Sequence, residues 1–303
     1  MKLFDLHCDT PSLLYKRGES IESNALHVSL EKTSCFEKYL QCAAIWSDPA
    51  LSDGECFEFF KNAAGYFKDQ CNGYITDANT LQSSGSGFIL TVEDSRLISD
   101  IPDGVTRLYD FGVRVLTLVW KGLSAVGGAW DTSEELTKKG KDILEECFST
   151  GIIPDISHAS DKAALYTLER GRKTKKPVIA THSNSRTVCH HRRNLPDNIA
   201  RSVAEGGGII GISLYPPHLF GERAEICHVI DHISHYRSLL GDGCICLGCD
   251  FDGIGITPRE LEDISSLPRL YDALSKRFGE SFAEGVFYNN AYNFFINNLQ
   301  REV

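Results

Sequence analysis

The sequence predicts an α/β barrel of the (β/α)₈ TIM type, formed by a single domain that spans residues 1–303. Short apolar runs rich in β-branched residues alternate with segments of helical periodicity, which is the pattern of successive βα units around a parallel sheet. A doubly wound nucleotide-binding sheet is the rival architecture, and it would require a glycine-rich turn after an early strand. The sequence has no such turn, and it has no low-complexity linker that would divide the chain.

Eight apolar runs are the candidate strands. In chain order they are LFDLHCD, YLQCAAIWS, GFILTVED, VRVLTLVW, GIIPDISH, PVIATHS, GIIGISLY and CICLGCDFDG. Helical periodicity predicts crossover helices over 133–151, 161–171 and 225–241, and a final packing helix over 285–299. The glycines of EGGGIIG precede the seventh run, so we expect them in the loop that leads into it.

Composition narrows the class of partner. The formal charge is −10 and no run of Lys or Arg occurs, which argues against nucleic acid or a membrane surface as the main partner and favours a small-molecule substrate. The N-terminus lacks the apolar core of a signal peptide, so we expect a cytoplasmic protein. The 11 cysteines are scattered, and in a reducing compartment most should be buried thiols, including those of CICLGC.

Polar residues gather at the ends of the predicted strands, where barrels of this kind place their reactive groups. They are His7 and Asp9 at the end of the first run, Glu93 at the end of the third, His158 at the end of the fifth, His182 at the end of the sixth and Asp250 at the end of the eighth. One such residue alone is usually a turn or cap residue. Six at one rim would put three carboxylates into a concave site, and a divalent cation is the simplest way to balance their charge.

The spacing of these residues predicts two metal ions. His7 and Asp9 are two residues apart on a strand and point to the same side, so both can bind one ion, whereas Cys8 points to the opposite face. His158 and His182 can hold a second ion, with Glu93 bridging the two through its oxygens. Such a pair would trap a bridging water and lower its pKa, which produces a hydroxide nucleophile for hydrolysis. The donor set suits Zn²⁺, with Mn²⁺ or Co²⁺ as alternatives.

Five segments together resemble a known family. DLHCDTP, TVEDS, IPDISHAS, ATHSNSRTVCHHRRNLPD and LGCDFDG resemble, in this order, the signature segments of the membrane (renal) dipeptidases, which are dinuclear zinc metallopeptidases, and of their bacterial members. The resemblance covers roughly residues 5–255. It implies a barrel of the amidohydrolase kind, frequent homodimers, and the same assignment of the five ligands to two zinc ions.

The resemblance also implies two substrate-binding residues. Arg193 matches the residue that holds the substrate carboxylate, and Asp250 matches the acid near the substrate amine. The chemistry of a dipeptide agrees, because its ammonium and carboxylate lie a few bonds apart and require one fixed anion and one fixed cation. Asp250 is also a candidate general base that takes the proton of the bridging water and passes it to the leaving amine.

Two further features need an interpretation. Trp120, in LTLVWKG, stands where the animal enzymes have a histidine that contacts the substrate, so we expect it to line a side-chain pocket and to offer one N–H donor. His228, His232 and His235 have helical spacing, and we interpret them as surface imidazoles of a crossover helix outside the barrel.

We therefore expect a zinc-dependent dipeptidase that hydrolyses the peptide bond of dipeptides through a metal-bridging hydroxide. One alternative is another amidohydrolase, acting on a lactam, a cyclic amide or an N-acyl amino acid. A second alternative is a non-catalytic metal-binding protein. The presence of Glu93 and Asp250 favours catalysis, because a protein that only binds metal needs no proton acceptor at that strand end.

Overall fold

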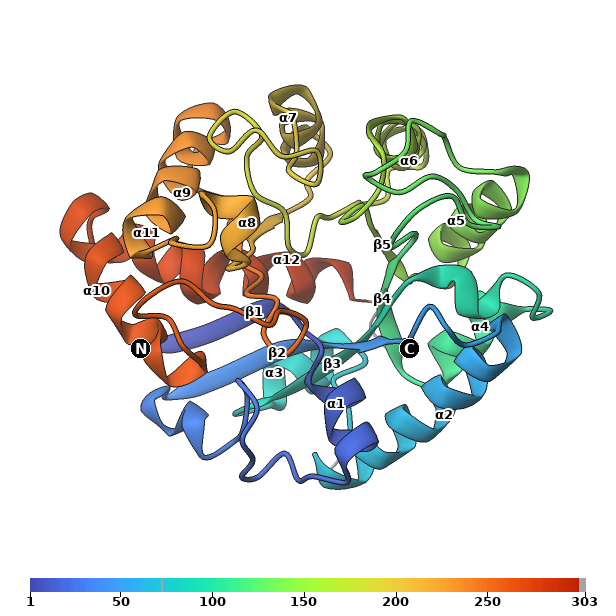
Figure 1. The fold of residues 1–303 in the computed structure, drawn as a ribbon, viewed down its shortest axis with the longest axis horizontal. Coiled ribbons are helices and arrows are strands. Elements are labelled where there is room, and N and C mark those ends of the chain that lie inside the picture. The colour runs from blue at the N-terminus through green and yellow to red at the C-terminus, as the bar shows by residue number, and fades with distance from the viewer. Residues whose placement is uncertain (72, 300–303) are drawn as a thin grey trace.

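A parallel β-sheet forms the centre of the computed structural model, which describes residues 1–71 and 73–299. Its strands are hydrogen-bonded in the order β5-β4-β3-β2-β1-β7-β6. Their bounds are β1 Lys2–Cys8, β2 Lys38–Trp46, β3 Gly87–Glu93, β4 Val113–Thr117, β5 Ile153–Asp155, β6 Ile210–Ile212 and β7 Ile245–Leu247. Each strand coincides with one of the predicted apolar runs, and the sheet curls so that the helices lie outside it (Figure 1).

The sixth predicted run, residues 177–183, closes the barrel between β5 and β6. Ile179 pairs with Asp155 and Ala180 pairs with Ile210, both in the parallel sense. The eight-stranded TIM-type arrangement is therefore confirmed. The difference from the prediction is that the sixth run contributes isolated bridges instead of a regular strand.

Close backbone approach explains this irregularity. A Cβ added to Gly211 would lie 1.9 Å from the carbonyl oxygen of Thr181, and one added to Gly248 would lie 1.8 Å from the same oxygen. Only residues without a side chain fit at these two positions. The chain at Thr181 is thus held against β6 and against the end of β7.

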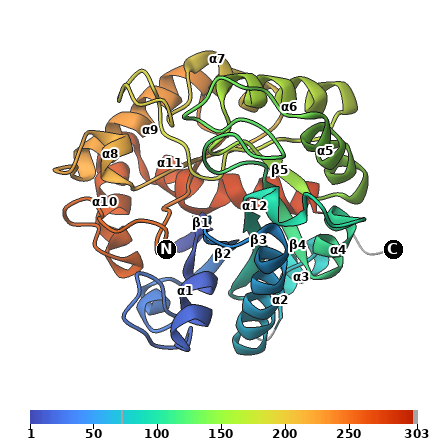
Figure 2. The same cartoon turned by 45° about the vertical axis from the view of Figure 1, so that its right-hand side comes forward.

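Helices surround the sheet (Figure 1 and Figure 2). Their bounds are α1 Thr10–Arg17, α2 Asp53–Gln70, α3 Ala78–Ser83, α4 Gly104–Asp110, α5 Lys138–Thr150, α6 Asp161–Thr174, α7 Asp197–Glu205, α8 Pro216–Leu219, α9 Ile226–Leu240, α10 Leu267–Phe278, α11 Glu280–Glu284 and α12 Asn290–Asn298. Among the described residues, none of these helices has both the length and the hydropathy needed to span a bilayer.

The predicted crossover helices are confirmed with shifted ends. Helix α5 begins only after the N-cap Thr137, whose side chain accepts a hydrogen bond from the backbone N–H of Gly140, and it ends at Gly151 in a left-handed conformation. Helix α6 continues beyond Gly171, where the sequence predicted its end. A Cβ at Gly171 would lie 2.7 Å from Val178, so this glycine serves close packing and does not stop the helix.

The C-terminal packing helix is also confirmed, as a π-helical turn over Gly285–Asn289 followed by α12. Phe295 of α12 stacks on Phe4 of β1 with ring centroids 5.2 Å apart. This contact covers the first strand, which would otherwise be exposed so near the N-terminus.

The cysteines behave as predicted. All 11 are free thiols and seven of them are buried, including Cys244, Cys246 and Cys249 of the eighth run. Burial raises the pKa of the Cys246 and Cys249 thiols well above the usual range, so these side chains act as small apolar groups.

Candidate metal centre

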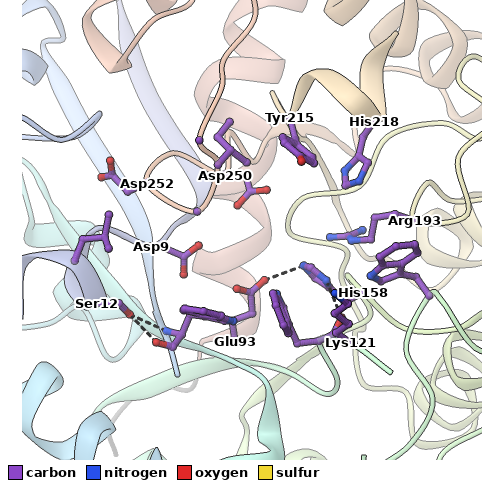
Figure 3. Close-up of a pocket in the computed structure, with 17 residues that line it drawn as sticks. Asp9, Ser12, Glu93, Lys121, His158, Arg193, Tyr215, His218, Asp250 and Asp252 are labelled. Carbon is purple, nitrogen blue, oxygen red and sulfur yellow. Dashed lines mark hydrogen bonds and ion pairs between the residues drawn. The ribbon is translucent and has the colours of Figure 1, made fainter. Parts of the chain in front are cut away.

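A cavity of about 390 Å³ lies at the carboxyl ends of the strands (Figure 3). Six predicted site residues line it: Asp9, Glu93, Trp120, His158, Arg193 and Asp250. The two other predicted residues, His7 and His182, are buried beside Glu93. The structure therefore brings together all the residues that the sequence singled out. We call His7, Asp9, Glu93, His158 and His182 the metal-binding floor of this cavity.

The first part of the floor comes from β1. His7 lies in the strand and Asp9 directly after it, so both face the same side as predicted. His7 Nε2 lies 3.6 Å from Asp9 Oδ2 and 3.7 Å from Glu93 Oε1. In the described part of the chain, neither His7 Nε2 nor Asp9 Oδ1 has a hydrogen-bond partner, although both atoms are buried. Unpartnered buried polar atoms are costly, and coordination of a cation would satisfy both.

Electrostatics at this position favour positive charge. Burial opposes protonation of His7, but the carboxylates of Glu93, Asp9 and Asp250 outweigh it and raise the pKa of His7 to about 10. Burial, and then the charge of Asp9, raises the pKa of Glu93 well above its usual range. A divalent cation would supply the missing positive charge and leave the imidazole neutral as a ligand.

The second part of the floor is a pair of imidazoles that face Glu93, the last residue of β3. His158 Nε2 lies 2.9 Å from Glu93 Oε1 and 2.9 Å from His182 Nε2. His182 Nε2 lies 3.3 Å from the same carboxylate oxygen. Burial, followed by the charges of Arg193 and His7, lowers the pKa of both histidines well below the usual range, so both rings are neutral.

Hydrogen bonds fix which nitrogen carries the proton in each ring. His158 Nδ1 lies 3.0 Å from the carbonyl oxygen of Trp120, which can only accept, so Nδ1 donates and Nε2 keeps its lone pair. His182 Nδ1 lies 2.8 Å from the hydroxyl oxygen of Thr181, whose own proton goes to Asp155. His182 Nδ1 is therefore also the donor. Two lone pairs then meet beside a carboxylate oxygen, and a cation between them would satisfy all three groups.

The donor atoms form groups small enough to hold an ion. Ligand atoms within 4.8 Å of one another define the groups His7, Asp9 and Glu93; Glu93, His158 and His182; and His7, His182 and Asp250. The first two groups are the two ion sites predicted from the sequence, and they share Glu93. Imidazole nitrogen and carboxylate oxygen without thiolate suit Zn²⁺, Mn²⁺ or Co²⁺.

Arg193 is buried, whereas its neighbour Arg192 is exposed. Its Nη1 donates to Ser183 Oγ at 3.1 Å and its Nη2 donates to the carbonyl oxygen of His182 at 3.0 Å. Its Nε is buried and has no partner within the described residues. The guanidinium is thus held rigidly at the cavity surface with hydrogen-bonding capacity left for a ligand.

Asp250 lies in the turn after β7 with a left-handed backbone, φ 65°. Its backbone N–H donates to the carbonyl oxygen of His7 at 3.1 Å, which ties this turn to β1. Burial is the main cause that raises the pKa of Asp250 to about 7. A Cβ at Gly253 would lie 2.1 Å from Asp9 Oδ2 and 2.5 Å from Asp250 Oδ1, so glycine leaves room for both carboxylates. Asp250, Glu93 and Arg193 all point toward the middle of the cavity (Figure 3).

Aromatic rings from several segments of the chain also line the cavity. They are Trp46, Trp120, Trp130, Tyr215 and His218, and we call them the aromatic wall. The three tryptophans are the only ones in the sequence. Trp46 and Trp120 lie 5.2 Å apart between ring centroids, and Tyr215 and His218 lie 4.7 Å apart. The wall therefore consists of two ring pairs and Trp130.

Sequence reasoning identified only Trp120 of the aromatic wall. Trp46 ends the second apolar run and Tyr215 ends the seventh, so the strand-end rule that found the metal ligands would have selected both. Trp130 and His218 lie in connecting segments, and their positions depend on tertiary packing.

One interpretation of the other histidines was wrong. His232 is fully buried: its Nδ1 accepts from the backbone N–H of Ser185 at 3.0 Å, and its Nε2 donates to the carbonyl oxygen of Leu219 at 3.1 Å. Helix α9 thus turns His232 inward, where its ring links the loop after the sixth run to the end of α8. His228 and His235 are partly exposed, and neither lies in the cavity.

The fold and the floor define a class of protein: an α/β barrel whose strand ends carry a candidate centre for two cations. Residues 1–296 match the family model of the membrane dipeptidases, peptidase family M19. The chain belongs to this family, which confirms the resemblance found in the sequence and extends it over almost the whole chain.

Individual relatives share about a third of their aligned residues with this chain. Dipeptidase 3 of Rattus norvegicus is 34% identical over 74% of this chain and 49% of its own length. An uncharacterized dipeptidase of Schizosaccharomyces pombe is 33% identical over 62% of this chain and 47% of its own length. The chain thus spans about half the length of these two relatives.

Solved structures confirm the fold. A metallo peptidase from Rhodobacter sphaeroides, liganded with a phosphinate mimic of the dipeptide L-Ala-D-Ala, superposes with a TM-score of 0.88. The alignment covers 99% of both chains at 22% sequence identity.

Proposed function

We propose that this protein is a metallo-dipeptidase that hydrolyses the peptide bond of dipeptides. The observation that carries the proposal is the position of the metal-binding floor beside a fixed cation, Arg193, and a fixed anion, Asp250, in one cavity (Figure 3). Membership of the M19 family supports it, and so does the dipeptide mimic bound by the structural neighbour from Rhodobacter sphaeroides.

Arg193 binds the substrate carboxylate in this proposal. Its Nε has no partner, and each Nη has one hydrogen left after its bond to the protein. The two protein bonds keep the guanidinium in place before the substrate arrives, which lowers the entropy lost on binding. A carboxylate receives charge-assisted hydrogen bonds from such a group.

Asp250 binds the substrate ammonium and handles the proton. Its Oδ1 lies 3.8 Å from His7 Nε2, so it stands at the edge of the floor and also faces the cavity. From there it can accept a proton from the attacking water and deliver it to the leaving amine.

The floor holds two divalent cations, most suitably zinc, in this proposal. His7 and Asp9 hold one, His158 and His182 hold the other, and Glu93 binds both. When bound, the cations supply a water of lowered pKa and polarise the scissile carbonyl.

The aromatic wall receives a substrate side chain. Trp120 lines the cavity and packs against Trp46, so its indole presents a broad apolar surface. We propose Trp120 as a substrate-binding residue whose main effect is on which side chains are accepted.

A substrate panel tests the proposal. Zinc-loaded protein should hydrolyse dipeptides such as Ala-Ala, and a chelator should abolish the activity. N-acetylation of the dipeptide should also abolish it, because the ammonium that faces Asp250 is lost. Hydrolysis of acetylated amino acids or lactams without hydrolysis of free dipeptides would support the other amidohydrolase activity. A protein that binds zinc and hydrolyses none of these substrates would be the non-catalytic alternative.

Metal analysis and sedimentation complete the test. We expect close to two zinc ions per chain, because two of the three groups of donor atoms, His7 with Asp9 and His158 with His182, meet at Glu93. A homodimer and a cytoplasmic location remain predictions, the second supported by the free thiols of all 11 cysteines.

A further inference from the structure

Asp155 lies beneath the metal-binding floor and accepts four hydrogen bonds. It is the last residue of β5 and is fully buried. Oδ1 accepts from the backbone N–H groups of Ser157 at 2.8 Å and Thr181 at 2.9 Å. Oδ2 accepts from the hydroxyls of Thr117 and Thr181, each at 2.6 Å. Every oxygen lone pair of this carboxylate thus has a specific donor.

These four hydrogen bonds determine the direction of the hydrogen bond between Thr181 and His182. A carboxylate can only accept, so the Thr181 hydroxyl must use its single proton on Asp155. Its oxygen can then only accept from His182 Nδ1, which lies 2.8 Å away. The proton of His182 is therefore on Nδ1, and Nε2 presents its lone pair to Glu93 and His158.

The backbone of Thr181 is fixed from the other side. Gly211 and Gly248 both pack against its carbonyl oxygen, and its N–H is bonded to Asp155. Around its hydroxyl, Ser157 Oγ is a further neighbour at 3.3 Å, more distant than Asp155 Oδ2 and His182 Nδ1.

We propose that Asp155 is a positioning residue for the candidate metal centre: acting through Thr181, it sets the tautomer of His182 and thereby the affinity for the cation that His158 and His182 hold. This inference rests on the proposed metal centre and goes beyond it, because Asp155 touches neither the cavity nor a metal ligand. His158 obtains the same tautomer from the backbone carbonyl of Trp120, which no substitution removes. The tautomer of His182 depends on the side chains of Thr181 and Asp155, so it can be changed by substitution.

Asp155→Asn is the decisive substitution. It keeps the shape of the side chain and reverses the direction of its hydrogen bond with the Thr181 hydroxyl. The backbone N–H groups of Ser157 and Thr181 need an acceptor, so the new amide oxygen must face them. The amide NH₂ then faces Thr117 and Thr181 and donates to both hydroxyls. The Thr181 proton is released toward His182 Nδ1, and the ring proton moves to Nε2, where it competes with the metal ion for the lone pair.

Two measurements detect this reversal. Nitrogen-15 NMR of the imidazoles in chelator-treated protein should show His182 protonated at Nδ1 in the wild type and at Nε2 in Asp155→Asn. Zinc titration against a competing chelator should show one of the two zinc ions bound about 10- to 100-fold more weakly in the variant, as is typical for partners of metal-bound histidines.

Matched variants separate this role from general stability. Thr117→Val removes the other hydroxyl from the same Oδ2 but has no path to His182, so zinc affinity and the His182 tautomer should stay as in the wild type. Thr181→Val removes the connecting hydroxyl and should weaken the same zinc ion, whereas Thr181→Ser keeps a hydroxyl and should restore it. Thr181→Val also serves if Asp155→Asn fails to fold.

The outcomes are distinct. The proposal is overturned if His182 stays protonated at Nδ1 in Asp155→Asn, or if Thr181→Val binds both zinc ions as tightly as the wild type. A wild type that takes up no zinc would refute the metal centre, and the tautomer measurement would still test the relay because it needs no metal.

Discussion

The metal-binding floor and the aromatic wall belong to one cavity and are built differently. On the floor, hydrogen bonds determine atom by atom where lone pairs point, as at His158 and His182. On the wall, rings pack by contact at 5.2 Å between Trp46 and Trp120, and the three tryptophans are partly exposed. Under the proposed function, this difference would let the aromatic wall change substrate preference while the metal-binding floor stays intact. Changes to the floor should be all-or-none, and changes to the wall should be graded.

Glu93→Gln should have the largest effect, because one neutral side chain replaces the charge that both halves of the floor share. We expect fewer than one zinc ion per chain and a loss of at least about 10³-fold in kcat/KM, since the cations contribute several kcal/mol. Metal analysis and steady-state kinetics measure both. A variant that kept its zinc and its activity would show that the two ion sites do not share Glu93.

Asp250→Asn should come next, because it removes the proposed proton carrier at the edge of the floor and keeps the side-chain volume. We expect kcat to fall by about 10²- to 10⁴-fold. If only KM rises, Asp250 binds the ammonium and takes no part in proton transfer. Zinc content should be measured alongside, so that loss of metal is not mistaken for loss of proton transfer.

Arg193→Ala tests whether a residue of the cavity outside the metal-binding floor binds the substrate carboxylate. Loss of the charge-assisted contact to the carboxylate should raise KM by roughly 30- to 150-fold, which corresponds to about 2–3 kcal/mol. Arg192→Ala is the matched control, since that arginine is exposed and donates to the carbonyl oxygen of Thr132 outside the cavity. Equal KM values for the two variants would remove Arg193 from substrate binding.

Trp120→Ala should have the smallest effect on rate and the clearest effect on preference. We expect about 10-fold lower activity on the best dipeptide and a broader range of accepted side chains, because part of the aromatic wall disappears. Trp120→Phe should keep the shape selectivity and lose only the contribution of the indole N–H. A dipeptide panel on which Trp120→Ala matches the wild type throughout would show that the wall does not select substrates.

The same contrast explains what the sequence could predict. The residues of the floor could be predicted because they lie at the ends of apolar strands. The spacing of His7 and Asp9 also predicts that both side chains point to the same side of the strand. The wall was mostly missed because Trp46 and Tyr215 are apolar enough to count as ordinary strand residues. Asp155 was missed for a related reason: it sits within GIIPDISH, and only the folded barrel brings Thr117 and Thr181 to its oxygens.

The barrel closes through the bridges at Ile179 and Ala180, which form a seam without a regular strand. His158 follows the strand on one side of the seam, and His182 lies near the end of the sixth run itself. A cation shared by these two histidines would hold the seam together, so local opening of the barrel should depend on metal occupancy. Hydrogen exchange should report this coupling: the amides of Ile179 and Ala180 should exchange faster after chelation, while those in the middle of β2 should change least. The cation bound by His158 and His182 would then also stabilise the barrel against local unfolding at this seam.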